Sequence, residues 1–182
     1  DTATFDFSTV TNLSTSDQTE VDSIVFNPGA SAYTITLASP EQEFLYISGI
    51  GIVNNSGVTQ TFVSSDGGFF FHAFYFFNNA TAGDLTVFYN PAIEATAWCK
   101  TTFLDSSNAG SSTITNAGGP AGFPGQTEFL NQSSAANATI INEGAPTGGV
   151  NGKTFFVEDT SAATATLINN GGTGEGASGG YI

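Results

Sequence analysis

The sequence contains almost no positive charge. Its 182 residues include two lysines and no arginine against 16 Asp and Glu, which gives a formal net charge of −14. Because a surface that binds nucleic acid needs a basic stripe, this composition excludes nucleic acid as an electrostatic partner. Methionine is also absent, so we expect that an N-terminal segment has been removed or that this is an excised piece, and a cleaved secretory signal is the simplest cause. The sequence therefore predicts an exported protein.

Cysteine and long apolar segments are equally scarce. Cys99 is the only cysteine, so no intrachain disulfide is possible, and an exported protein of this kind fits a bacterial cell surface. The longest apolar run, residues 69–77, is far shorter than the roughly 18 residues of a membrane-spanning helix. With 17 Phe and 40% hydrophobic residues the chain can nevertheless build a core. Its 22 Gly and many Ser, Thr and Asn disfavour helices and predict an all-β fold.

Internal repeats are the strongest pattern in the sequence. Similar segments begin at Phe103, Phe129 and Phe156, and a fourth, weaker copy begins at Phe76. The starting positions follow one another at a nearly constant interval, and glycine-rich spacers absorb the small variation. A repeat of this length, made of short strands and bends, buries its apolar side only by stacking on its neighbours. The period predicts a right-handed parallel β-helix with coils of about 25–27 residues.

The repeats are expected to form one solenoid domain. Residues 1–25 are predicted to be a first coil or cap, residues 26–75 degenerate coils, and residues 76–182 four clearer repeats. A β-sandwich is the alternative, since it also uses short strands and turns, but it does not explain a regular period of this length.

Equivalent positions of the four copies form columns. At the same distance after each Phe stands an alanine, followed by Gly or Ala, which predicts a crowded bend: Ala82, Ala109, Ala135 and Ala162. The strand that follows alternates with period two. Its inward parity is predicted to hold Val87, Ile114, Ile140 and Leu167, and to end in a structural ladder of side-chain amides at Asn116, Asn142 and Asn169, which Tyr89 interrupts in the first copy. The opposite parity is predicted to face outward as a candidate ladder for lateral association with a neighbouring solenoid: Thr86, Phe88, Thr113, Thr115, Thr139, Ile141, Thr166 and Ile168.

Candidate catalytic and metal-ligating residues are few. His72 and Cys99 lie one repeat length apart, so one coil would place them above one another, but two ligands seldom make a metal site. Asp105 is expected to stack near Glu158 with Asn131 between them, and a pair of carboxylates is what a glycosidase requires. We interpret the acids as a solvated surface, predict no catalytic residue, no metal site and no cofactor, and leave weak calcium binding open.

The resemblance of the chain to a known family rests on two motifs. The run from Tyr46 to Gln60, YISGIGIVNNSGVTQ, is followed by coils of the type Phe-x-x-x-Ser-x-Ala-x-x-Ala-Thr-Ile-x-Asn-x-Gly. This pattern resembles the repeat regions of large bacterial extracellular proteins, including passenger regions of the autotransporter type, from about Ser23 to Gly172. The resemblance implies a stalk or an adhesive surface. The stretch 69–77 departs from it, being far more aromatic than a typical coil.

Function is predicted from these surfaces. Aromatic side chains between positions 69 and 77 are expected to make a contact between subunits: Phe69, Phe70, Phe71, Phe74 and Tyr75. No amphipathic capping helix is evident after the last repeat, which we interpret either as a piece cut from a longer passenger region or as an end that stacks head to tail into filaments. We therefore expect a secreted, non-enzymatic structural or adhesive solenoid that binds itself, with surface polysaccharide as a second partner. The alternatives are a carbohydrate-active enzyme and an ice- or glycan-binding module that uses the outward threonines.

Overall fold

The computed structural model describes residues 1–15, 17–38, 40–64, 70–93 and 98–182, and these residues form fourteen β-strands and no helix. The strands are β1 (Thr2–Phe5), β2 (Asn12–Thr15), β3 (Thr19–Phe26), β4 (Thr34–Leu37), β5 (Glu43–Asn54), β6 (Gln60–Val63), β7 (His72–Phe76), β8 (Thr86–Asn90), β9 (Cys99–Phe103), β10 (Thr113–Asn116), β11 (Gly125–Phe129), β12 (Thr139–Asn142), β13 (Lys153–Phe156) and β14 (Thr166–Asn169).

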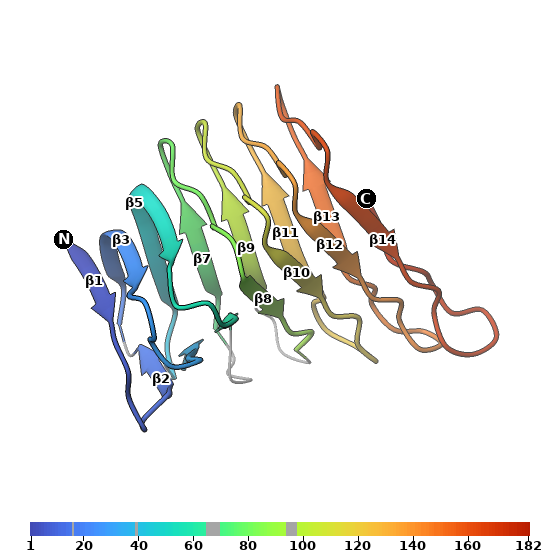
Figure 1. Ribbon diagram of the computed structural model, residues 1–182. Helices are drawn as coiled ribbons and strands as arrows, with labels where there is room; N and C mark the ends of the chain where they lie inside the picture. The colour runs from blue at the N-terminus through green and yellow to red at the C-terminus, as the bar shows by residue number, and fades with distance from the viewer. Residues whose placement is uncertain (16, 39, 65–69, 94–97) are drawn as a thin grey trace.

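These strands alternate between two parallel sheets. Sheet A contains the odd-numbered strands from β1 to β13 and sheet B the even-numbered strands from β2 to β14, each in chain order. Every coil therefore contributes one strand to each sheet, and Figure 1 shows the coils following one another along a single axis from the N-terminus to the C-terminus. The predicted all-β parallel solenoid is confirmed.

Coil length is regular in the second half of the chain only. Phe76 pairs with Phe103, Phe103 with Phe129, and Phe129 with Phe156, so these coils have the length that the repeats predict. Earlier coils differ, because Phe5 pairs with Phe26 across a shorter coil and Ile47 pairs with Phe76 across a longer one. The strands of short and long coils still pair in parallel, with a register shift between Val21 and Ser23 where β3 pairs with β5. The other differences in length fall in the connections between strands.

The hydrophobic core lies between the two sheets. In-register pairing stacks the rings of Phe76, Phe103, Phe129 and Phe156, with centroids 4.8–4.9 Å apart. Ile114 and Ile140 line the core from sheet B and are fully buried, as predicted, and Leu167 packs against them at its edge. Each fully buried side chain of this size stabilises the fold by roughly 1.5–3 kcal/mol.

A crowded bend connects sheet A to sheet B, as the alanine column predicts. Ala82, Ala109 and Ala135 are fully buried. The residues that follow them adopt positive φ, with 78° at Gly83 and 49° at Ala136. A Cβ atom on Gly83 would lie 2.4 Å from the carbonyl oxygen of Ile52, so this position accepts no larger residue.

The register of β8 corrects the predicted orientation of that strand. Phe88 pairs with Ile114, and Val87 pairs with Thr113. The shift comes from one additional residue in the preceding bend, where Leu85 adopts a φ of 52° and is 50% exposed. Because side chains alternate with period two, a shift of one residue exchanges the two faces of a strand. Val87 therefore faces outward, and the prediction that it faces inward is wrong.

Candidate functional site

The outward surface of sheet B is built from two columns of side chains, which we call the threonine face. The first column is Asn12, Thr34, Thr61, Val87, Thr113, Thr139 and Thr166, and the second is Ser14, Thr36, Val63, Tyr89, Thr115, Ile141 and Ile168. Six of the eight residues predicted to face outward lie in these columns. The columns also extend over β4 and β6, whose coils are too degenerate in sequence for the repeat pattern to place their threonines.

Two of the predicted outward residues face the interior instead. Thr86 is 2% exposed, and its hydroxyl donates to the carbonyl oxygen of Ala82 at 2.8 Å. Phe88 is fully buried and stacks on Phe62 with ring centroids 4.9 Å apart. The additional residue at Leu85 explains both corrections.

Charged residues are absent from sheet B. Its seven strands, all of which the structure describes, contain no Asp, Glu, Lys or Arg. Sheet A by contrast carries Glu20, Asp22, Lys100, Glu128 and Lys153 on its strands, in addition to the buried Glu43. In a chain with a net charge of −14, the threonine face is thus an uncharged surface that spans every coil.

The outward surface of sheet A is aromatic around its middle strands, β5, β7 and β9. We call this surface the aromatic face, and its members are Phe44, Tyr46, Phe71, Tyr75, Phe77 and Trp98. Strand pairing places Tyr46 beside Tyr75, and their rings stack with centroids 5.4 Å apart and an interplanar angle of 20°. Phe71 contacts Trp98 edge to face, at 5.2 Å between centroids.

The predicted aromatic contact is divided between the two sides of the sheet. Phe74 is fully buried in the core, so its place in an exposed contact is wrong. Tyr75 lies on the outward surface, and Phe70 and Phe71 are 45% and 38% exposed. Phe69 lies outside the described residues. The alternation of strand β7 separates these side chains, and the same alternation would have found Phe77 on the outward side.

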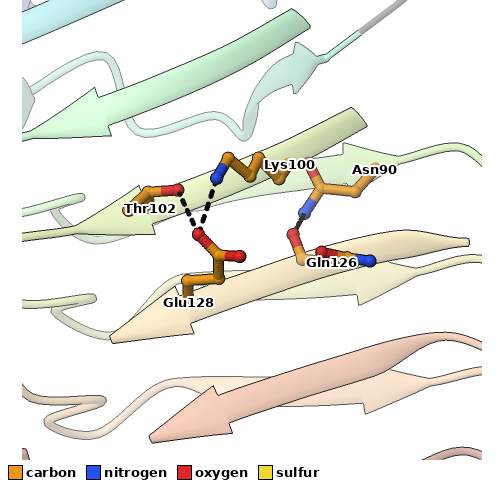
Figure 2. A network of polar contacts seen from close by, with 5 residues as sticks. All are labelled: Asn90, Lys100, Thr102, Gln126 and Glu128. Carbon is orange, nitrogen blue, oxygen red and sulfur yellow. Dashed lines mark hydrogen bonds and ion pairs between the residues drawn. The ribbon is translucent and has the colours of Figure 1, made fainter. Parts of the chain in front are cut away.

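A polar network borders the aromatic face. The Lys100 ammonium contacts Glu128 Oε2 at 2.7 Å, and the Thr102 hydroxyl donates to the same oxygen at 3.4 Å, as Figure 2 shows. Lys100 also lies 5.8 Å from the ring centroids of both Tyr75 and Trp98.

The phenol of Tyr46 stays neutral at physiological pH. Desolvation by burial, and to a smaller extent the electrostatic effect of Tyr75, raises the pKa of Tyr46 above its ordinary value of 10.0. Its hydroxyl can therefore donate a hydrogen bond.

The predicted asparagine ladder is confirmed and is longer than predicted. Side-chain Nδ2 donates to the next Oδ1 from Asn90 to Asn116 (2.9 Å), from Asn116 to Asn142 (2.8 Å) and from Asn142 to Asn169 (3.0 Å). Asn90 is the member that Tyr89 seemed to replace, because the shifted register moves it into the column. The ladder also bonds to sheet A, as the contact from Asn90 to the carbonyl oxygen of Gln126 shows in Figure 2.

His72 and Cys99 do lie above one another, as their spacing predicts. They pair directly, and Glu43 pairs with His72 on the other side. All three side chains are fully buried. Among the described residues, no group of three or more His, Cys, Asp or Glu is arranged to hold a metal ion.

The column of Asp105, Asn131 and Glu158 forms at a corner, as predicted. The Asp105 backbone N–H donates to Asn131 Oδ1 at 3.0 Å, and the Asn131 N–H donates to Glu158 Oε2 at 2.7 Å. Asn78 extends this column by donating its backbone N–H to Asp105 Oδ2. All four residues have positive φ, between 55° and 66°. These side chains connect successive coils and fix a tight corner.

None of the described residues form a helix of the length and apolarity that crossing a membrane requires. No family model, no curated protein and no solved structure matches this chain.

Proposed function

We propose that this chain is a non-enzymatic, exported structural solenoid of the bacterial cell surface that associates with copies of itself through the threonine face. The observation that carries the proposal is the absence of charge from all seven strands of sheet B, each of them fully described, in a chain of net charge −14.

A second copy fits this face for electrostatic reasons. Like charges across an interface cost free energy, and acids elsewhere on the surface oppose random association. The threonine face is the surface on which two copies meet without bringing like charges together. Its hydroxyl, methyl and β-branched groups recur from strand to strand at about 4.8 Å, so the columns of one copy match those of another. The proposed contact joins solenoids side by side, as the candidate association face suggests, and differs from the head-to-tail stacking also expected from the sequence.

The test places charge on the threonine face. Thr113→Glu combined with Thr139→Glu adds two carboxylates on paired strands, which would face the same carboxylates of an antiparallel or shifted partner. We expect the wild type to form assemblies at micromolar concentration, measured by sedimentation velocity, and the double variant to remain monomeric. Negative-stain electron microscopy of the wild type should show rods joined along their sides.

The matched control adds the same charge elsewhere. Ser106 and Gln132 are exposed at a corner, so Ser106→Glu combined with Gln132→Glu should leave the assemblies intact. Circular dichroism confirms that both double variants are folded. A monomeric wild type, equal behaviour of the two double variants, or rods joined only end to end would contradict the proposal.

A further inference from the structure

We propose that the aromatic face is a binding site for a neutral polysaccharide chain. The site is independent of the proposed self-association, because it lies on sheet A and the threonine face lies on sheet B.

The first observation is a hollow with an aromatic wall and a small floor. Ala73 stands between Phe44 and Lys100 in one outward column, so the larger side chains around it enclose a depression of about 270 Å³. Phe71 and Trp98 border its other side, and Gln42 adds an exposed amide. Aromatic surface combined with a few polar groups is the usual lining of a ligand site.

A second hollow lies directly beyond the stacked tyrosines. Its volume is about 360 Å³, and it is lined by Tyr46, Phe77, Glu20, Ser48 and Asn78. The Ser48 hydroxyl donates to Glu20 Oε1 at 2.8 Å, and Asn78 Nδ2 donates to the Ser48 carbonyl oxygen at 2.6 Å. Hydrogen-bonding groups are therefore held in place beside an aromatic surface.

The two hollows form one elongated site. The first is bordered by Tyr75 and the second by Tyr46, and these two rings stack against each other at 5.4 Å. The site thus crosses strands β3, β5, β7 and β9 and extends over several coils. Two hollows that share a wall suit a ligand with repeating units better than a single small molecule.

Charge selects the chemical class of that ligand. The net charge of −14 repels polyanions, and Lys100, the cation of the site, is already paired with Glu128 at 2.7 Å. A sugar ring offers an apolar C–H surface for an aromatic ring and hydroxyl groups for amide, carboxylate and phenol partners. Carbohydrate of no net charge is therefore the ligand that this surface complements.

Binding can be followed by the fluorescence of Trp98, because it is the only tryptophan of the chain and borders the first hollow. Purified protein is titrated with hexasaccharides of cellulose, xylan and mannan, and with an alginate oligomer of the same length as the polyanionic comparison. We expect a saturable change in Trp98 emission with at least one neutral oligomer and none with alginate. The affinity should stay nearly constant between about 0.05 M and about 0.5 M salt, since screening acts on charge.

Three variants locate the site. Tyr75→Ala removes a central ring and should weaken binding at least about tenfold, as expected for an aromatic hot spot. Ala73→Leu fills the floor of the first hollow without removing any ring, and should weaken binding similarly. Tyr181 is 54% exposed at the far end of the solenoid, so Tyr181→Ala is the matched control and should keep the affinity within about twofold.

Several outcomes would overturn the proposal. These are a lack of response to every neutral oligomer by the folded wild type, stronger binding of alginate, or equal losses in Tyr75→Ala and Tyr181→Ala. Loss of self-association in Tyr75→Ala, with no response to any sugar, would assign the aromatic face to a protein contact instead.

Discussion

At the scale of single residues, the asparagine ladder shows how a polar side chain is used inside a solenoid. Asn116 donates to Asn142 Oδ1 and to the Lys153 carbonyl oxygen, and it accepts from Asn90 Nδ2 and from the Thr127 hydroxyl. The amide is fully buried, and all of its hydrogen-bonding capacity is used. Buried polar groups that are fully satisfied specify one arrangement of the chain, so this amide fixes which coil positions face each other.

Substituting Asn116 therefore has a large predicted cost. Asn116→Ala leaves the partner groups on two neighbouring coils without hydrogen bonds in a buried site, and each such group costs about 1–3 kcal/mol. We expect the free energy of unfolding to fall by about 3 kcal/mol or more, measured by urea denaturation. Asn169→Ala is the matched control, because Asn169 is exposed and accepts one ladder bond, and it should cost less than about 1 kcal/mol. Equal losses at the two positions would contradict a structural role that depends on burial.

At the scale of a strand, one additional residue in a bend determines which side chains face the core. Leu85 shifts β8 by one position relative to the repeat alignment, and the shift moves Phe88 inward and Tyr89 outward. Positive φ is rare for a leucine, so nothing in the residue types marks the place of the insertion. Aligning the repeat copies on the alanine and glycine of the bend does not reveal the additional residue either, because Ala82 and Gly83 precede it.

The corrected register of β8 makes a direct prediction. Phe88→Ala removes a fully buried ring and should cost about 3–5 kcal/mol of stability, as core Phe→Ala substitutions do. Tyr89→Ala removes a ring that is 41% exposed and should cost less than about 1 kcal/mol. Urea denaturation of the two variants measures both losses of stability, and the larger loss is expected for Phe88→Ala. The reverse order of stabilities would restore the register that the repeat alignment predicts.

The sequence predicts the parallel solenoid and most of its columns, because the repeats place identical residues at identical positions. Phe103, Ala109, Ile114 and Asn116 recur with so little change that their stacking follows from the period alone. The aromatic face is different. Tyr46 and Tyr75 lie in coils that share no repeat sequence, at a separation that departs from the period, so only strand pairing brings their rings together.

At the scale of the whole molecule, stability is expected to vary along the axis. Each coil contacts only its neighbours, so its stability is set by the interfaces it makes with them. Phe76 and Phe103 are fully buried in coils away from both ends, while Phe5 and Phe156 are only partly buried. The coils at the two ends of this chain are therefore expected to open more readily than those between them.

Hydrogen exchange measures this gradient. Backbone amides of β7 and β9 should exchange most slowly, at a rate that reports global unfolding, whereas those of β1 and β14 should exchange through local opening. Mass spectrometry of peptic fragments resolves the coils separately. Uniform protection along the axis would instead indicate that all coils unfold in one cooperative step.

The in-register pairing of Phe103 with Phe129 has a genetic consequence. A duplication of the segment between these two residues would insert one complete coil, whose phenylalanine, alanine and asparagine would continue every existing column. The rod would lengthen by about 4.8 Å while both outward surfaces kept their order. Recombination between repeats can therefore change the length of such a solenoid by whole coils, because each added coil continues the existing core.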